Sequence, residues 1–448
     1  MSKVTLNVEK EYSCDVLVCG GGMSGFAAAV SAARSGASVI LIEAGGFLGG
    51  TATKGLVGPF MTCYDSKGET QIIKGIFSEL TERLVAENGG ISPEECRGGD
   101  SLSGYRTAGH IGVTPFDVEA LKRVTEQMCI EAGVKLLYHT LFLDCEKVDN
   151  RITKVYAADN NRVISISAKV FADTTGSCAL AYRAEAETTR GNDDGIMQTN
   201  SLFFTISGVD KEMLDKHMSQ NSEMRKRYYM DELDLGRENK TFPCGTNKLR
   251  IFEGLNGEWF VNMAQIDEQM NELDNEEVTQ AEITQRDQIV RIVKFLRETV
   301  PALKNIRLVA TASDLGIRES RRLVGLETLT LDHISTSHKF KDSIAVCANS
   351  VDIHMKNGVS YTANTGENYY IPLSCLISKN IDNLVTAGKS LSADKYAFAA
   401  VRVMPPCVAM GEAAGICAAF SALDETIPAD VDSDRVCAEL LNRGAFIE

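Results

Sequence analysis

Short, unbroken apolar runs alternate in the chain with longer segments in which apolar residues recur every three or four positions. An apolar run at 16–19 is followed by a small-residue segment over 26–35 and a second apolar run at 39–42. This order predicts a strand, a helix packed on a sheet and a neighbouring strand. Helical periodicity returns at 74–88 and at 114–132, so the first third of the chain predicts alternating strands and helices.

Three short alternating segments follow, at 135–146, 152–159 and 163–167. They predict a small antiparallel meander, which leads into an apolar strand over 169–176 that ends in small residues. Near the other end, a strand-then-glycine pattern at 383–388 precedes an alanine- and glycine-rich helix over 407–421.

The middle of the chain differs in character, with longer and more polar segments. Strands are expected near 202–207 and 259–263, and a helix over 278–300. The apolar stripe of that helix comprises Ile283, Ile289, Val290, Val293 and Leu296. We therefore predict an α/β protein in which 1–180 and 377–448 form one discontinuous domain, and 181–376 forms an inserted α+β substrate domain.

The first strand ends in a glycine-rich turn. Gly20 allows a tight turn, Gly22 allows the backbone to approach a pyrophosphate, and Gly25 allows close packing of helix on strand. Glu43 follows the second strand, about 18 residues after the last glycine, where a carboxylate accepts hydrogen bonds from a ribose diol. This arrangement predicts a dinucleotide site, with a glycine turn that serves packing alone as the alternative.

Composition excludes several classes of protein. The net charge of −15 opposes binding to nucleic acid. No apolar run reaches the roughly 18–20 residues of a membrane span, and the polar first residues do not resemble a signal peptide. The 13 cysteines include no CxxC pair and the 6 histidines no HxxxH pair. We therefore expect a cytoplasmic protein without a disulfide framework or a metal site.

Motifs spread along most of the chain carry a family resemblance. The chain resembles FAD-dependent oxidoreductases of the glutathione-reductase-like flavoprotein superfamily, and more distantly the flavoprotein subunits of fumarate reductases. The matching segments are 20–25 with Glu43, 49–51, 113–117, 171–176, 316–322, 401–405 and 410–415.

The resemblance implies a Rossmann-like FAD-binding domain that holds FAD non-covalently. It places the glycines of the first turn at the pyrophosphate, Glu43 at the adenosine ribose and Phe142 beside adenine. Two departures from the family are Ser177, where an acid is common, and Lys389, where many flavoproteins have Asp. The cofactor-binding residues that it implies are Gly20, Gly22, Gly25, Glu43, Ala44, Gly50, Thr51, Phe142, Thr175, Gly176, Gly388, Val401 and Met404.

Four residues are candidates for catalysis. Hydride transfer to a flavin needs a group that orients the substrate and a group that handles the paired proton. Arg402 lies next to the expected flavin ring, and Arg318 precedes two further arginines; each suits an anionic group, and ion pairing is the alternative. His354 suits proton transfer, with a structural hydrogen-bonded histidine as the alternative. Lys395 stands where the family commonly has histidine, and a lysine there suits an anionic substrate.

We therefore expect an FAD-dependent oxidoreductase that transfers a hydride between flavin N5 and a small polar or anionic molecule. The alternatives are a flavin-dependent isomerase or lyase, an NAD-only dehydrogenase, and a flavin-binding regulatory protein. A second GxGxxG motif for NAD(P)H is not evident, so the electron acceptor stays open. A homodimer is expected.

Overall fold

The computed structural model describes residues 7–97, 111–191, 195, 197–266, 269–354, 360–363 and 367–448. Its largest sheet has seven strands in the order β3-β2-β1-β6-β5-β4, with β17 pairing to β6. The strands are β1 (Val8–Cys19), β2 (Val39–Ile42), β3 (Lys135–Leu137), β4 (Leu141–Val148), β5 (Arg151–Asp159), β6 (Arg162–Asp173) and β17 (Leu384–Thr386).

The core of this sheet is parallel. β2, β1, β6 and β17 run in one direction, and Ile42, Cys19, Asp173 and Thr386 lie side by side in register. The residues that follow these four strands therefore meet at one edge of the sheet. The predicted α/β class with a parallel sheet is confirmed.

Two details of the predicted strands are wrong. The segments expected at 163–167 and 169–176 form one continuous strand, β6, which ends at Asp173. Its first half pairs antiparallel with β5, and its last residues pair parallel with β17. The segment expected at 135–146 divides at His139, which has φ of 50°. Its first part, β3, pairs parallel with β2, so the antiparallel meander contains only β4, β5 and β6.

Two helices cross the sheet together, α1 (Met23–Arg34) and α11 (Met404–Leu423). A Cβ atom on Gly411 would lie 2.2 Å from the Ser24 carbonyl oxygen, and one on Gly415 would lie 2.2 Å from that of Ala28. The two helices therefore pack backbone against backbone. By length and composition α11 is apolar enough to span a membrane, but 89% of its most apolar window is buried, as befits a core helix.

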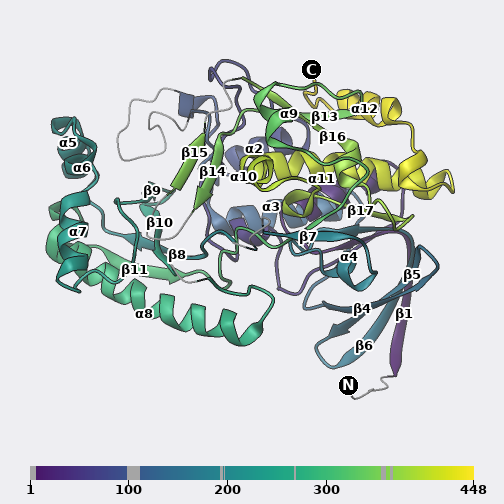
Figure 1. Cartoon of the computed structure of the whole chain (residues 1–448), viewed down its shortest axis with the longest axis horizontal. Coiled ribbons are helices and arrows are strands. Elements are labelled where there is room, and N and C mark those ends of the chain that lie inside the picture. The colour runs from purple at the N-terminus through teal and green to yellow at the C-terminus, as the bar shows by residue number, and fades with distance from the viewer. Residues whose placement is uncertain are drawn as a thin grey trace.

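The remaining helices are α2 (Ile76–Ala86), α3 (Val118–Glu131), α4 (Ala179–Arg183), α5 (Lys211–Gln220), α6 (Met224–Arg227), α7 (Met230–Glu238), α8 (Asn275–Thr299), α9 (Leu331–Ser335), α10 (Lys395–Val401) and α12 (Ser433–Asn442). Of these helices, α5, α6, α7 and α8 lie together at one end of the molecule (Figure 1).

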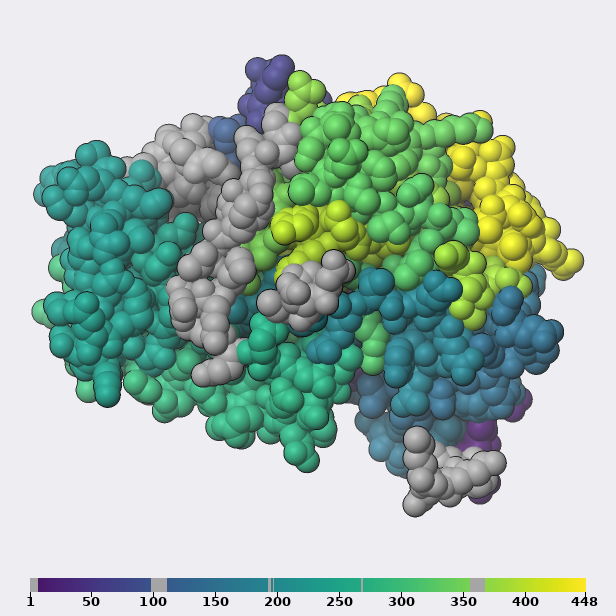
Figure 2. All heavy atoms as spheres, viewed as in Figure 1, coloured from purple at the N-terminus to yellow at the C-terminus, as the bar shows by residue number. Residues whose placement is uncertain are grey.

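A second, four-stranded sheet has the order β11-β8-β10-β9 and lies with α8 at the same end of the molecule (Figures 1 and 2). Its strands are antiparallel: β8 (Ser201–Ser207), β9 (Ile251–Glu253), β10 (Glu258–Gln265) and β11 (Arg307–Thr311). Three two-stranded sheets join β7 (Thr188–Arg190) to β12 (Arg321–Leu323), β13 (Ser343–Cys347) to β16 (Tyr369–Pro372), and β14 (Val351–His354) to β15 (Ser360–Ala363).

Buried apolar residues divide in a similar way. One core cluster contains the second sheet and α8, with members from Leu202 to Leu315. The cluster around α1 and α11 includes residues of β13, β14 and β16, among them Ile344, Val351 and Ile371. The domain division at 181 and 376 stays a prediction, and these clusters place 329–377 with the larger core.

Helix α8 begins earlier than predicted because Asp274 caps it, accepting hydrogen bonds from the amides of Glu276 and Glu277. Its predicted stripe is correct at Ile289, Val293 and Leu296, which are buried. The other two members are wrong. Ile283 and Val290 are 54% and 63% exposed, because the core contacts only one side of the helix.

Candidate functional site

The turns that follow the four parallel strands gather at one edge of the main sheet. Gly20 follows β1, Glu43 follows β2, Thr174 follows β6 and Gly388 lies two residues after β17. Ligands of open parallel sheets bind at this carboxyl edge. The structure thus brings together glycines and an acid that are up to 368 positions apart.

The three glycines of the first turn have different surroundings. Gly20 has φ of 104°, and a Cβ atom there would lie 2.7 Å from the Thr174 carbonyl oxygen. A Cβ atom on Gly25 would lie 1.9 Å from the Gly20 carbonyl oxygen, whereas one on Gly22 would meet nothing within 4 Å. Gly20 and Gly25 therefore allow close packing, while Gly22 faces open space at the N-terminus of α1. This space and the unpaired amides of the helix suit a pyrophosphate.

Glu43 is 7% exposed and accepts hydrogen bonds from two backbone amides, Gly21 at 2.8 Å and Gly45 at 2.7 Å. It also accepts one from Nζ of Lys54 at 2.6 Å. A carboxylate offers about four acceptor positions, so one position remains for a ribose hydroxyl. Sequence reasoning missed Lys54, because a lysine eleven residues downstream has no motif that marks it.

Four further predicted cofactor-binding residues lie in the segments near Glu43. Ala44 is exposed directly after it, and the amide of Thr140, two residues before Phe142, donates to the Glu43 carbonyl oxygen at 2.9 Å. Phe142 is half-buried in β4. Gly50 has φ of 51°, and Thr51 beside it is exposed. These positions are compatible with the adenosine side of a dinucleotide, and their roles stay predictions.

The turn after β6 is organised by Asp173, which is buried. Asp173 accepts hydrogen bonds from the amide and hydroxyl of Thr175, at 3.0 and 2.7 Å, and from the amide of Ala181 at 2.8 Å. Burial raises the pKa of Asp173. Gly176 adopts φ of 73°, and its Cα packs against the Lys389 side chain. The acid that orders this turn therefore lies before Thr175, while Ser177 occupies the position where the family commonly has one.

Lys389 follows the turn after β17, and its side chain reaches the segment that precedes Arg318. Gly388 has φ of 72°, and a Cβ atom there would lie 2.7 Å from Oγ of Ser24. Nζ of Lys389 donates a 2.7 Å hydrogen bond to the Ile317 carbonyl oxygen. Burial lowers the pKa of Lys389 to about 8. Lys389 thus links the carboxyl edge of the sheet to the residue before Arg318.

The N-terminus of α11 begins at Met404, after Val403 as N-cap. Pro405 and Pro406 carry no amide hydrogen, so the first turn offers fewer donors than an ordinary helix, although its dipole remains. Val401 is fully buried in the core cluster of α1 and α11. Its side chain therefore cannot face a cofactor, and Met404, which is half-buried, is the better placed of the two.

Arg402 is the C-cap of α10 and lies at the corner between α10 and α11. Its Nη2 donates to the Asp352 carbonyl oxygen at 3.0 Å and lies 3.5 Å from Asp352 Oδ2 and 3.4 Å from Gln198 Oε1. Nε2 of His354 lies 2.9 Å from the same Asp352 oxygen. Asp352 and His354 belong to β14, which stands between the second sheet and α10 in Figure 1.

Two further arginines complete this cluster. Nη1 of Arg318 donates to the Thr199 carbonyl oxygen at 2.6 Å, and Nη1 of Arg250 lies 3.4 Å from Nδ1 of His354. The structure therefore brings together three predicted residues, Arg402, Arg318 and His354. Sequence reasoning missed Arg250, which carries no local motif, and Asp352, which lies two residues before the predicted His354. We name Gln198, Arg250, Arg318, Asp352, His354 and Arg402 the arginine cluster.

The charges of the arginine cluster control its titration. Burial tends to raise the pKa of Asp352, but the hydrogen bond from His354 and the charges of Arg402 and Arg318 hold that pKa below its ordinary value. Burial and the Arg318 charge lower the pKa of His354 to about 4. His354 is therefore neutral at pH 7, with Nε2–H donating to Asp352 and the lone pair of Nδ1 facing Arg250. Burial also lowers the pKa of Arg318, to about 9.

The other predicted positions lie apart from the cluster. Lys395 is the first residue of α10, at the opposite end from Arg402. Arg322 forms a 2.6 Å ion pair with Glu319, and Arg321 stacks on Tyr182 with 3.8 Å between its guanidinium carbon and the ring centroid. Of the three neighbouring arginines, only Arg318 belongs to the cluster, where its charge acts on Asp352 and His354. Within the described ranges, no group of three His, Cys, Asp or Glu side chains is arranged to hold a metal ion.

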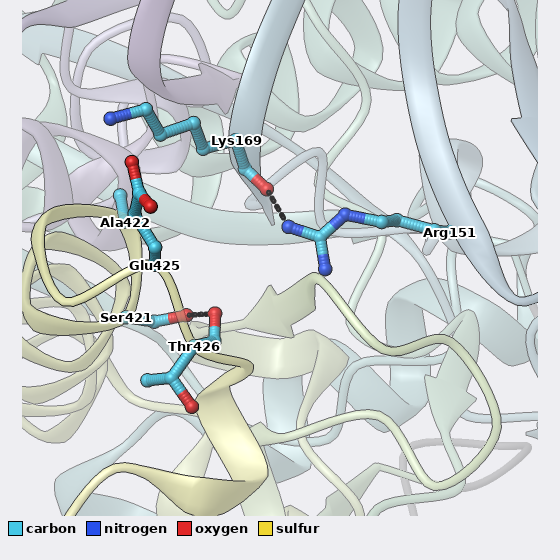
Figure 3. Close-up of a pocket in the computed structure, with 6 residues that line it drawn as sticks. All are labelled: Arg151, Lys169, Ser421, Ala422, Glu425 and Thr426. Atoms are coloured by element: carbon cyan, nitrogen blue, oxygen red, sulfur yellow. Dashed lines mark hydrogen bonds between the residues drawn. The ribbon is translucent and has the colours of Figure 1, made fainter.

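A surface hollow lies far from this site, at the C-terminal end of α11 (Figure 3). In it Arg151 donates to the Lys169 carbonyl oxygen at 3.5 Å, and Ser421 donates to that of Thr426 at 2.8 Å. Arg402 precedes the other end of this 20-residue helix, which is about 30 Å long. The hollow is therefore separate from the arginine cluster.

Comparisons with known proteins identify the family of the chain. The family described as FAD dependent oxidoreductase matches residues 15–440. A comparison with curated proteins finds no match.

Solved structures with a similar fold are remote in sequence. A geranylgeranyl bacteriochlorophyll reductase-like protein from Thermoplasma acidophilum is 12% identical, with a TM-score of 0.48, and the match covers 97% of this chain and 85% of that chain. The p-nitrophenol 4-monooxygenase of Pseudomonas putida is 10% identical, with a TM-score of 0.49 and the same coverage. The L-proline dehydrogenase of P. horikoshii is 15% identical, with a TM-score of 0.42, covering 98% of this chain and 100% of that chain.

The family match spans both ends of the chain, which meet at the carboxyl edge of the main sheet where Gly22 leaves room for a pyrophosphate. The chain belongs to the FAD-dependent oxidoreductase family, and it is an enzyme that has FAD as its cofactor and acts on a small molecule.

Proposed function

We propose that the enzyme transfers a hydride between FAD and a small, anionic organic substrate, and that the substrate binds at the arginine cluster. The observation that carries this proposal is the place of Arg402. Its guanidinium is held by the β14 residue Asp352, while its backbone leads directly into the N-terminus of α11. A fixed guanidinium binds a carboxylate through paired hydrogen bonds.

When bound, FAD accepts or supplies two electrons as a hydride, and the paired proton must go to or come from a base. We assign that proton to Nδ1 of His354, because the neutral ring donates through Nε2 to Asp352 and keeps a lone pair on Nδ1. Solvent reaches this pair, since 44% of the Asp352 side chain and 14% of the His354 side chain are exposed. Arg402, with 13% exposed, orients the substrate.

The test is anaerobic reduction of the bound flavin by a panel of hydroxy acids, amino acids and sugars, followed as loss of flavin absorbance. An acidic member of the panel is expected to bleach the flavin. Arg402→Ala should retain FAD and lose roughly 10- to 150-fold in kcat/KM, the equivalent of 1.5–3 kcal/mol for a charge-assisted hydrogen bond. Arg286→Gln, on the outer face of α8, is the matched control and should leave the rate unchanged.

Other outcomes would support the alternatives. A product of unchanged mass, formed without net loss of hydrogen, would favour an isomerase or lyase. A reduced flavin that no electron acceptor reoxidises would favour a regulatory protein. Membership of an FAD-dependent family excludes the alternative of an NAD-only dehydrogenase. The electron acceptor stays open, and reoxidation assays with different acceptors identify it. A homodimer and a cytoplasmic location stay predictions, and sedimentation tests the first.

A further inference from the structure

The arginine cluster carries more positive than negative charge. The guanidinium groups of Arg250, Arg318 and Arg402 surround the single carboxylate of Asp352, an excess of two positive charges among the described residues. Lys248 lies close enough to add to the positive potential at Arg250. The neighbouring acid Glu319 does not offset this excess, because it pairs with Arg322 at 2.6 Å.

Several polar atoms around the cluster have no hydrogen-bond partner within the part of the chain that the structure describes. Gln198 and Thr199 are only 3% and 7% exposed, yet Gln198 Nε2 and Thr199 Oγ1 are unpaired. The side-chain amide of Gln198 faces the other members of the cluster, because its Oε1 contacts Arg402. Nε of Arg402 and Nε of Arg250 are unpaired as well. Buried donors without partners are costly in a folded protein, so this set indicates a ligand with several acceptor atoms.

We propose that the substrate is an organic dianion, a dicarboxylate or a phosphoryl compound, whose second anionic group binds Arg250. This inference rests on the proposed function and names the substrate class of the same site. A monoanion bound to Arg402 leaves one guanidinium charge without a counterion, whereas a dianion neutralises the excess. The acceptor oxygens of a dianion also satisfy the unpaired nitrogens of Arg250, Arg402 and Gln198.

Arg250 is a specificity residue in this proposal. It immediately precedes β9 of the second sheet, while Arg402 belongs to the helices over the main sheet. The contact between Arg250 and His354 Nδ1 is long, at 3.4 Å, so an anion can replace it at little energetic cost. A substrate that reaches both arginines must therefore span the junction between the two core clusters.

The test is calorimetric binding of small anions to the FAD-saturated protein, in which the bound cofactor already fills the pyrophosphate site. The probes are acetate as monoanion, and malonate and methyl phosphate as dianions. At least one dianion is expected to bind about tenfold or more tightly than acetate, because a second charge pair forms. The stronger of the two dianions identifies the substrate as a dicarboxylate or a phosphoryl compound.

Two variants assign the preference to Arg250. Arg250→Gln should reduce the ratio of dianion to acetate affinity below about threefold, whereas Arg250→Lys should keep most of it, because it retains the charge. Arg286→Gln should behave as wild type. Equal affinities for all three probes, or an unchanged ratio in Arg250→Gln, would overturn the proposal.

Binding and flavin reduction separate the two proposals. If a substrate of the panel reduces the flavin but acetate binds as tightly as the dianions, hydride transfer stands and the dianion inference is wrong. If dianions bind preferentially through Arg250 but no compound exchanges electrons with the flavin, the anion site stands and hydride transfer is wrong.

Discussion

At the residue scale, Glu412 shows how a buried carboxyl outside the active site affects this protein. It is 1% exposed on α11, and Oε2 accepts a 3.0 Å hydrogen bond from the amide of Ile76, while Oε1 has no partner among the described residues. Burial raises the pKa of Glu412 from 4.5 to about 7, although the charges of Arg443 and Arg34 oppose the shift. Ionising Glu412 therefore destabilises the fold.

This pKa predicts a pH dependence of stability. Between about 4.5 and 7 the folded protein holds a proton that the unfolded chain has released, so the Glu412 contribution to stability falls as pH rises through this window and stays low above it. Glu412→Gln keeps the acceptor for Ile76 and should stabilise the protein at pH 8 by at most about 3 kcal/mol. Urea unfolding at pH 5 and pH 8 measures the difference.

The control is Glu298→Gln, which changes an exposed carboxyl on α8. It should leave stability unchanged at both values of pH. An equal gain from Glu412→Gln at pH 5 and pH 8 would show that packing, and not ionisation, is responsible.

At the element scale, the strand, turn and helix around Gly22 separate packing from cofactor binding. Gly22→Ala should give a protein that folds as well as wild type, because the new Cβ meets nothing within 4 Å and φ at this position is −66°. Its FAD affinity should fall by about tenfold or more, because the methyl group fills the space beside the helix N-terminus. Flavin fluorescence quenching measures the affinity.

Gly25→Ala is the matched variant in the same turn. Its Cβ would lie 1.9 Å from the Gly20 carbonyl oxygen, so β1 and α1 must separate, and stability should fall by about 1–3 kcal/mol or more. Normal stability of Gly25→Ala would contradict this account, as would full FAD affinity in Gly22→Ala.

Helix α8 offers a second prediction at this scale, from two adjacent apolar residues. Ile289 is fully buried and Val290 is 63% exposed. Ile289→Ala should destabilise the protein by about 2–5 kcal/mol, whereas Val290→Ala should change stability by no more than about 0.5 kcal/mol. Chemical denaturation of both variants measures the two values, and similar losses would place α8 differently on its core.

At the scale of the whole molecule, segments from both ends of the chain meet at the predicted FAD site. The carboxyl ends of β1, β2, β6 and β17 lie in one row, and β17 is separated from β6 by more than 200 residues. Because a ligand that binds only the folded state stabilises it, free FAD at 100 times its Kd should add about 2.7 kcal/mol to the free energy of unfolding. Unfolding of apoprotein and holoprotein over a series of FAD concentrations tests this, and an identical Tm in both would contradict it.

The local sequence was sufficient for the first strand–turn–helix–strand unit of the main sheet. Gly20, Gly22, Gly25 and Glu43 lie within one strand–helix–strand unit, so their spacing alone indicates where they meet. The sequence did not predict β6 as one continuous strand. Its first half pairs with β5 and its last residues pair with β17, and these partners are known only from the folded sheet. The exposure of Ile283 and Val290 on α8 was not predicted either, because the periodicity of apolar residues does not show how wide the buried face of a helix is.

What the sequence by itself determined is the FAD-binding α/β fold, because strand, turn, helix and acid interact over short distances along the chain. Only the tertiary structure decided the composition of the arginine cluster. Arg250, Asp352 and Arg402 come from three segments, and although the segment of Arg402 is marked by its motif, nothing local indicates that the three residues meet. The excess of positive charge and the unpaired buried donors depend on which residues become neighbours in space. Both therefore arise only when the chain has folded.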